Sequence, residues 1–390
     1  MGRSRSVVRD VRTLGWLVAR NLPHTATVTY ATNLWYAALW ADHLVAGALQ
    51  SRTICEQPIV FFRGPDGEPV ALEDRCAHRF IPLSMGQLCD GASSVECPYH
   101  GLRFGTDGAC VLNPHGSGRI PATLAVRSYP VVERHTMLWI WMGTDEADPD
   151  LIPDFSYLDP GAPGVLSKRD SLEMDVDYQL VIDNLLDLSH ASFLHRGVLG
   201  DPSTLACDIT IDSTESSVTV TRTRADVAPA KLFDLMFRND GADVDTWSIM
   251  RWDAPSCLRH EAGVCPPGEE RTDGITVIGT HLVTPSSKGK CTYHVAAVRL
   301  GESPNSDDAE IAEQLSALRR YAFDEQDRPI LEAQQRAYDL AGGVDSLRPV
   351  MLSIDAAPLR ARRVLAKIIA GENPDTDEMA DGERVFVTLD

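Results

Sequence analysis

The sequence predicts an α+β protein with two domains: first an all-β domain, then a domain in which helices cover an antiparallel sheet. Its 390 residues are enough for two domains of ordinary size. Short apolar runs separated by Gly and Asp turns fill the first part of the chain, whereas alternating runs and long helical segments fill the second. A stretch rich in Asp, Pro and Gly, residues 145–163, marks the junction between them.

These changes in pattern give the domain boundaries. We expect an N-terminal extension at residues 1–29, the all-β domain at 30–155, the α+β domain at 160–370 and a loose acidic tail at 371–390. In the first domain, two apolar runs flank a Gly-Pro-Asp-Gly turn and predict a hairpin. In the second domain, the predicted strands lie at 172–177, 217–223, 275–283 and 291–298, and the predicted helices at 178–195, 309–340 and 356–369.

Composition and charge narrow the functional class. The net charge of −20 repels phosphate backbones, so we expect no nucleic-acid partner. No apolar run reaches the ~18 residues that span a bilayer, so we expect no membrane association. The nine cysteines form an odd set with no secretory signal before them, which argues against a disulfide framework and favours the cytoplasm.

Two Cys/His couples carry the first chemical signal. Cys76-Ala-His78 and Cys97-Pro-Tyr-His100 both lie beside predicted turns. Two thiolates and two imidazoles suit a [2Fe-2S] cluster of the Rieske type, in which the cysteines bind one iron and the histidines bind the other. A structural zinc site is the alternative, because Cys2His2 also suits tetrahedral zinc. The C-x-H spacing, unusual for zinc fingers, favours the cluster.

A second group of polar residues lies in the predicted helix at 178–195. Asn184, Asp187 and His190 fall on one helical face, because they follow each other at steps of three. His195 is five residues further on, about 140° around an ideal helix. Both histidines therefore reach one metal only if the helix ends or bulges, and we predict a distorted turn at residues 192–194. The alternative is two histidines packed in a core.

Two histidines and one carboxylate on one side of Fe(II) leave adjacent positions open for dioxygen. Asp324, Glu325 and Asp327, in a later helical segment, are the candidate carboxylates, and their spacing alone does not choose among them. A cluster and a mononuclear iron in one chain would make an oxygenase with its own electron relay. A cluster without the second iron would make a Rieske electron-transfer protein, a different class.

In combination, several segments make the chain similar to the oxygenase components of Rieske non-heme iron oxygenases. Within that family it resembles the aromatic O-demethylase branch, which includes vanillate and dicamba O-demethylases. The resemblance covers residues 33–371. The matching segments are 76–80, 97–102, 113–116, 126–134, 183–190, 279–281 and 326–332.

The resemblance implies a fold and a set of residue roles. The second domain would have the helix-grip (START-like) fold, with Asp327 as the acidic iron ligand beside His190 and His195. Asp187 would link a cluster histidine of one chain to an iron histidine of the next in a homotrimer, and a carboxylate bonded to two ligand imidazoles would fix both rings. We group Asn184 with Asp187 as catalytic residues.

The resemblance also suggests where the substrate binds. His260 and His281 fall where relatives contact polar groups of the substrate. The apolar stretch 228–245 is expected to be a mobile loop that covers the site. Near the cluster, the arginines expected to bind an acidic redox partner are Arg79, Arg103 and Arg119.

We therefore expect the terminal oxygenase of a multicomponent Rieske monooxygenase. By resemblance it oxidises a small aromatic substrate, with O-demethylation as the first choice, using O2 and electrons that a reductase or ferredoxin takes from NAD(P)H. Its cofactors would be the [2Fe-2S] cluster and Fe(II). A ring-hydroxylating, cis-diol-forming dioxygenase is the alternative enzyme, since it uses the same metals.

Overall fold

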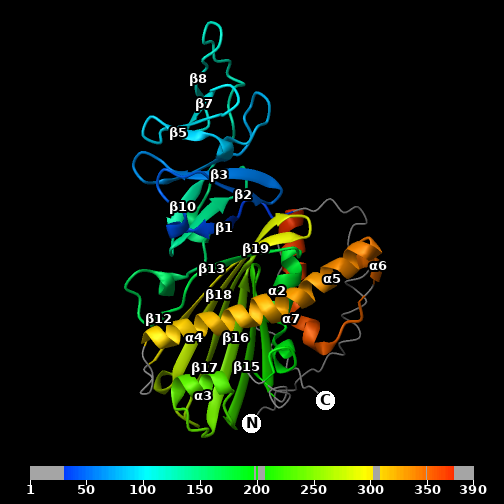
Figure 1. Cartoon of the computed structure of the whole chain (residues 1–390). Coiled ribbons are helices and arrows are strands. Elements are labelled where there is room, and N and C mark those ends of the chain that lie inside the picture. Colours follow the sequence, from blue (N-terminus) through cyan, green and yellow to red (C-terminus); the bar gives the residue numbers. More distant parts are fainter. Residues whose placement is uncertain (1–29, 197–198, 201–206, 302–307, 348, 373–390) are drawn as a thin grey trace, which may run out of the picture.

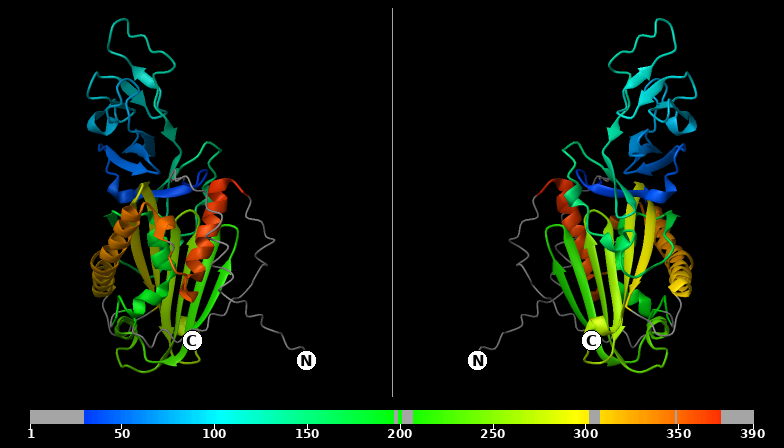
Figure 2. Two further views of the ribbon diagram at one scale, coloured as in Figure 1. Left: turned by 90° about the vertical axis from the view of Figure 1, so that its right-hand side faces the viewer. Right: turned by 90° about the vertical axis from the view of Figure 1, so that its left-hand side faces the viewer.

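The structure, a computed structural model, describes residues 30–196, 199–200, 207–301, 308–347 and 349–372. It has a small all-β domain seated on one end of a larger domain that is built around one wide sheet (Figures 1 and 2). The predicted class, an all-β domain followed by an α+β domain with an antiparallel sheet, is confirmed.

Short antiparallel strands form three sheets in the first domain. One sheet has the order β1-β11-β10, another β2-β3-β4-β9 and the third β5-β6-β7-β8. The predicted hairpin is β3–β4, in which Arg63 pairs with Pro69 across the turn. The strands are β1 (Trp35–Trp40), β2 (Gln50–Ile54), β3 (Gln57–Arg63), β4 (Pro69–Glu73), β5 (Gln87–Cys89), β6 (Ser94–Glu96), β7 (Arg103–Gly105), β8 (Cys110–Leu112), β9 (Ser128–Tyr129), β10 (Val131–Arg134) and β11 (Met137–Trp141).

An eight-stranded antiparallel sheet dominates the second domain. Its strand order is β12-β19-β18-β17-β16-β15-β14, and β13 also pairs with β19. Consecutive strands from β14 to β19 are therefore neighbours, as in a meander. The strands are β12 (Val165–Leu166), β13 (Asp170–Met174), β14 (Asp208–Ser213), β15 (Ser217–Val227), β16 (Val244–Asp253), β17 (Cys257–Cys265), β18 (Ile275–Ser287) and β19 (Lys290–Leu300).

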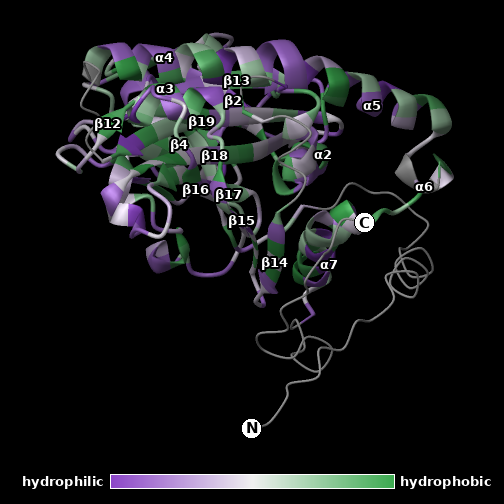
Figure 3. Cartoon of the chain, turned by 90° about the horizontal axis from the view of Figure 1, so that it is seen from below, coloured by the Kyte–Doolittle hydropathy of each residue, from purple (hydrophilic) through white to green (hydrophobic). Residues whose placement is uncertain are grey.

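Helices flank this sheet. Helices α4 and α5 run along one side of it and α7 lies near β14 (Figure 3). The long helix predicted for 309–340 is present but is interrupted by one π-helical segment, η8. The α-helices, with the 3-10 segment η5 and the π segment η8 that bear on the site, are α2 (Tyr178–Leu186), η5 (Leu188–Ser192), α3 (Lys231–Phe237), α4 (Asp308–Arg320), η8 (Tyr321–Asp327), α5 (Arg328–Ala341), α6 (Val344–Leu347) and α7 (Ala356–Ala370). Short 3-10 helices also occur at η1 (Ala41–His43), η2 (Leu83–Met85), η3 (Pro149–Leu151), η4 (Ser156–Leu158), η7 (Arg271–Asp273) and η9 (Ser353–Asp355).

Two expectations about local structure are wrong. The helix predicted for 178–195 ends at Leu186, and a 3-10 segment follows it. The stretch 228–245 is not a loop, because it contains helix α3, whose Met236 and Phe237 are buried. These two side chains pack with residues of β16, β17, β18 and α4 in a small apolar core, which gives the segment a reason to be helical.

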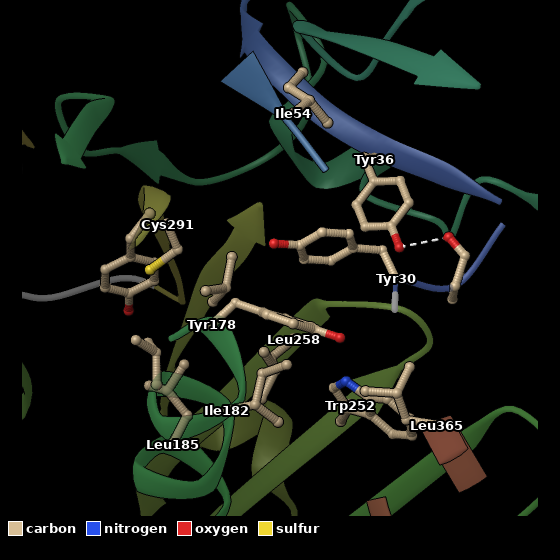
Figure 4. Packing of buried hydrophobic residues seen from close by; sticks show 14 of the residues in the cluster. Tyr30, Tyr36, Ile54, Tyr178, Ile182, Leu185, Trp252, Leu258, Cys291 and Leu365 are labelled. Carbon is tan, nitrogen blue, oxygen red and sulfur yellow. Dashed lines mark hydrogen bonds between the residues drawn. The ribbon is translucent and has the colours of Figure 1, made fainter. Parts of the chain in front are cut away.

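One apolar core joins the two domains. Tyr36 and Ile54 of the first domain belong to the same buried cluster as Tyr178 and Leu258 of the second, and Figure 4 shows these side chains close together. Each such side chain contributes about 1.5–3 kcal/mol when it is fully buried. Because the core is shared, the first domain is held firmly against the end of the large sheet.

Two further findings concern membrane-spanning helices and disulfide bonds. In the part of the chain that the structure describes, no helix is both long and apolar enough to cross a bilayer. All nine cysteines have free thiols in the structure.

Candidate active site with two metal centres

The four predicted cluster ligands meet at two loops of the first domain. Cys76 follows β4 and Cys97 follows β6, and both cysteines are buried. His78 and His100 extend from the same loops toward solvent. Their Nδ1 atoms lie 3.2 Å apart, a separation at which both nitrogens can bind one metal ion at about 2 Å.

The positions of the four predicted ligands distinguish a [2Fe-2S] cluster from a zinc site. Four ligands of one tetrahedral zinc would have all their donor atoms within about 4 Å of one another. Among the described residues, the only group of three or more His, Cys, Asp or Glu with mutually close donor atoms, within 4.8 Å, is His190, His195 and Asp327. The thiols and imidazoles of the first domain therefore do not converge on a single point. They fit a cluster that holds cysteines at one end and histidines at the other.

The backbone fixes the second cluster loop. The Gly101 N–H donates to the carbonyl of Cys97 at 3.0 Å, and this tight turn uses a left-handed glycine with φ +68°. His115 Nε2 donates to the carbonyl of His100 at 2.7 Å. His115 therefore braces this cluster loop.

The second set of predicted ligands meets in the second domain. His190 Nε2 lies 3.6 Å from Asp327 Oδ1, and His195 Nε2 lies 3.3 Å from Asp327 Oδ2. Asp327 and His195 are buried, and Asp327 Oδ2 has no hydrogen-bond partner among the described residues. A buried carboxylate oxygen without a donor is costly, and a metal ion bound by these three side chains would relieve that cost.

Hydrogen bonds turn both imidazoles toward this point. His190 Nδ1 donates to the backbone carbonyl of Asp187, and His195 Nδ1 donates to Gln326 Oε1 at 2.8 Å. Both Nε2 atoms thus keep their lone pairs free for a metal. Asn184 Nδ2 lies 3.4 Å from Asp327 Oδ1 and helps to orient the carboxylate.

Sequence reasoning missed Gln326. Besides holding His195, its amide donates to the carbonyl of Leu194 at 2.9 Å, so it fixes both the ring and the backbone before it. The sequence signal that could have identified Gln326 is its position directly before Asp327 in a predicted helix.

The local backbone explains how both histidines reach one ion. Helix α2 ends at Leu186, and Asp187, with φ −94° and ψ 87°, leaves the helical path. The Asp187 carboxylate then accepts from the Ser189 N–H at 2.9 Å and begins η5. A turn follows Ser192, close to the predicted distortion, but the decisive break occurs earlier than expected.

The structure distinguishes the three candidate carboxylates. Asp324 pairs with Arg328 at 3.0 Å, and Glu325 is exposed. Asp327 alone of the three points at the histidines. Burial by itself lowers the pKa of His195, but the negative charge of the nearby Asp327 carboxylate and the hydrogen bond to Gln326 outweigh it and raise that pKa overall.

A cavity of about 280 Å³ opens beside the His190, His195 and Asp327 side chains. His281 lines it, is buried and bonds through Nδ1 to the Tyr293 hydroxyl at 2.5 Å, while its Nε2 has no hydrogen-bond partner in the part of the chain that the structure describes. His260 also lines it and bonds to Ser248 Oγ at 2.8 Å. Most of the remaining wall is apolar and includes Leu188, Leu232, Phe233, Trp247, Met250, Val264, Val277, Leu315, Leu318 and Phe323.

Comparison with known proteins matches both halves of this arrangement. Residues 34–130 match the Rieske [2Fe-2S] domain family, and residues 174–371 match the vanillate O-demethylase oxygenase C-terminal domain family. The chain belongs to the Rieske oxygenases of the vanillate O-demethylase type. It is an oxidoreductase and an oxygenase component of a multicomponent monooxygenase system.

Similar proteins span nearly the whole of this Rieske oxygenase. The oxygenase component of chloroacetanilide N-alkylformylase from Rhizorhabdus wittichii is 37% identical over 88% of this chain and 97% of that protein. Dicamba O-demethylase from Stenotrophomonas maltophilia is 36% identical, with 87% and 98% covered. A crystal structure of dicamba monooxygenase bound to 3,6-dichlorosalicylic acid matches with TM-score 0.79 and 35% identity, covering 88% of this chain and 98% of that one.

In this Rieske oxygenase the residues present fit both inorganic groups. Cys76, Cys97, His78 and His100 would hold the cluster, and the triad of the second domain would hold Fe(II). When bound, the cluster supplies single electrons and the Fe(II) supplies open coordination positions for dioxygen. The protein itself orients the ligand rings and provides a largely apolar cavity beside them.

One of the three arginines predicted to contact a redox partner instead binds within the first domain. Arg103 donates to Glu96 at 2.8 Å and pairs with Asp90 at 3.1 Å, so it braces the first domain and is not free for a partner. Arg79 and Arg119 are exposed and remain candidates for contact with a redox protein.

Proposed function

We propose that this Rieske oxygenase O-demethylates a small aromatic substrate. The observation that carries the proposal is the cavity of about 280 Å³, which is apolar over most of its wall and ends at His190, His195 and Asp327. A ring with one or two polar substituents fits such a cavity. The names of relatives support the substrate class, because dicamba O-demethylase and vanillate O-demethylase act on methoxylated arenes.

The reaction balances as a monooxygenation. One methyl C–H bond of the methoxy group becomes C–OH with one atom of O2, while two electrons and two protons convert the other atom to water. The hemiacetal then breaks its C–O bond and releases formaldehyde and a phenol. The electrons come from NAD(P)H through a reductase or ferredoxin, which completes the multicomponent system, and we place this system in the cytoplasm.

We propose further that the working unit is a homotrimer. The cluster loops lie at the end of the first domain that points away from the large sheet (Figure 1), so an electron would have a long path to the iron of its own chain. Large apolar side chains are exposed around the cluster, with Phe80 at 71%, Met85 at 68% and Tyr99 at 60%. Others are exposed at the end of α5 and after it, with Leu340 at 90% and Val350 at 85%. Association of copies would cover such surfaces.

Asp187 is the proposed link between two copies. Its carboxylate is partly exposed and bonds within its own chain to Ser189. Its carbonyl already holds the iron ligand His190, so a bond from its carboxylate to a cluster histidine of a neighbouring copy would join the two centres through one residue.

Metal content and product analysis test the function. Protein purified without oxygen should contain about three irons and two acid-labile sulfides per chain, and His190→Ala should lower the iron to about two without loss of the cluster spectrum. With a reductase, NADH and a methoxybenzoate, we expect formaldehyde and a phenol in equal amounts. A cis-diol would assign the chain to the ring-hydroxylating dioxygenases, and a cluster without the third iron would leave an electron carrier.

A further inference from the structure

Polar side chains from four neighbouring strands form a row on the cavity wall. Arg222 of β15 is the register partner of Ser248 of β16, and the Ser248 hydroxyl bonds to His260 of β17. The ring of His281 on β18 lies 6.4 Å from that of His260. All four residues line the cavity.

Arg222 is the unusual member of the row. Only 12% of its side chain is exposed, and its nearest carboxylate, Asp187, is 4.0 Å away. That carboxylate oxygen already accepts from the N–H and the hydroxyl of Ser189. Among the described residues, Arg222 Nε has no hydrogen-bond partner. A buried guanidinium held this loosely is expensive, and a ligand anion would supply the missing bonds.

The other polar groups of the row carry no positive charge. Burial lowers the pKa of His260 to about 4, and the charge of Arg222 adds to this effect. Burial also holds the pKa of His281 well below its usual range. Arg319 lines the cavity as well, but it is committed to Asp170 at 2.7 Å. At neutral pH the row thus offers neutral imidazoles and one available cation, Arg222.

A second arginine strengthens the same end of the cavity. Arg224 lies two residues further along β15, so its side chain is on the same face of the strand as that of Arg222. It lines the cavity, and its Nε also lacks a partner among the described residues. Two guanidinium groups side by side favour an anion over a neutral group of the same shape.

We propose that Arg222 recognises an acidic substituent of the substrate, so that the site prefers an aromatic carboxylate or sulfonate to the corresponding uncharged amide. This inference rests on the proposed function, because it specifies the substrate class of the same cavity. Ser248 and His260 stand next to Arg222 and supply hydrogen bonds to the same group, while His281 faces the part of the ring nearer the triad. The selection is made by desolvated guanidinium groups, above all that of Arg222, in a cavity whose wall is otherwise largely apolar.

Binding to the iron-loaded protein, measured by calorimetry without a reductase, tests the proposal. The probes are 2-methoxybenzoate, 2-methoxybenzenesulfonate and 2-methoxybenzamide, and the two acids distinguish carboxylate from sulfonate. We expect the wild type to bind at least one acid more tightly than the amide. Arg222→Gln should weaken binding of that acid about 10- to 100-fold, because a charge-assisted bond is lost, and should leave binding of the amide unchanged.

Arg251→Gln is the matched control. Arg251 lies on β16, is 48% exposed and pairs with Asp253 at 2.6 Å, so its loss removes the same charge without touching the cavity. Arg222→Lys, which keeps the charge but not the planar fork, should weaken acid binding less than Arg222→Gln does. It also provides the test if Arg222→Gln does not retain the cluster spectrum.

Several outcomes would overturn the proposal. They are equal or tighter binding of the amide by the wild type, no saturable binding of either acid, or the same loss of acid binding in Arg251→Gln as in Arg222→Gln. Because no turnover is involved, these results do not depend on whether the bound ring is demethylated. Failure to form formaldehyde from an acid that binds through Arg222 would instead count against the proposed reaction.

Discussion

Asp187 serves the site twice, through different atoms. Its backbone carbonyl holds His190, and its carboxylate accepts from Ser189. Asp187→Asn keeps the carbonyl and an acceptor oxygen, so we expect the mononuclear iron and the cluster to remain. It removes the negative charge proposed to join two imidazoles, and turnover should fall by about 10- to 100-fold.

Iron and sulfide per chain, measured beside the steady-state rate, check this prediction. Asp212→Asn is the control, because Asp212 is an exposed residue of β14 and its substitution should change neither quantity. If Asp187→Asn lost the mononuclear iron, Asp187 would be part of the iron site itself and the linking role would be wrong.

Gln326 offers a second test at the residue scale. It accepts from His195 Nδ1 at 2.8 Å and donates to the Leu194 carbonyl. Gln326→Leu removes both bonds, frees the ring to rotate and should weaken iron binding about 10- to 100-fold, with the cluster unaffected. Retention of iron during titration with a chelator measures the effect. Gln334→Leu, at an exposed position of α5, should behave as wild type, and an equal loss there would remove Gln326 from the site.

For single residues, the sequence predicted which side chains come together but not the hydrogen bonds and ion pairs that orient them. His190, His195 and Asp327 come together as expected. The preference for Asp327 over Asp324, however, came from resemblance. In the structure it follows from Arg328, which engages Asp324. Such competition between neighbouring partners depends on side-chain directions that a spacing does not contain.

Among the elements, the π-helical segment η8 supplies the carboxylate of the proposed iron site. A π turn holds one extra residue compared with an α turn, so it changes the direction of every side chain after it. Gln326 and Asp327 are its last two residues, and both face the histidines. Glu325 in the same segment is exposed, so it occupies the turn without contributing to the site.

Deletion of Glu325 tests this role. The shortened segment is expected to close into a regular α-helix, so that the π turn and the backbone geometry that it gives to Gln326 and Asp327 are lost. We expect weaker binding of the mononuclear iron and an unchanged cluster spectrum. Glu325→Ala keeps the chain length and should retain about three irons per chain. Full iron content after the deletion would mean that the π geometry is dispensable.

In other elements, the spacing of apolar residues gave a wrong or missing prediction of secondary structure. Apolar spacing continues past Leu186, which is why a longer helix was predicted, yet Asp187 begins a new capped turn. An Asp two residues before a Ser is a capping signal that could have located this break. Strands β16 and β17 were not predicted, because their cavity-facing positions include Ser248 and His260 and so break the apolar alternation that identifies a strand.

For the whole molecule, the arrangement of the two centres raises the question of which chain supplies the electron. The shared core around Tyr36 and Tyr178 fixes the first domain on the large sheet, so a hinge that swings the cluster toward its own iron would have to break that core. Transfer between copies needs no such motion. Two differently inactivated proteins can therefore separate the routes.

His78→Ala removes an exposed residue that we propose binds the cluster, and His190→Ala removes a proposed iron ligand. Each protein alone should be inactive. When the two are coexpressed, transfer between neighbours in a closed ring makes a junction productive whenever an intact cluster faces an intact iron. In a random equal mixture that occurs at about one junction in four, so about a quarter of the wild-type rate should return.

The same mixture also distinguishes a failure to form mixed oligomers from an absence of electron transfer between copies. Proteins expressed separately and mixed without subunit exchange serve as the control, since they contain no mixed rings and should stay inactive. If coexpressed chains form mixed oligomers, as affinity tags on the two variants would show, and activity is still absent, the electron must travel within one chain. Asp187 would then have no partner across a boundary, and the shared core would have to open during each turnover.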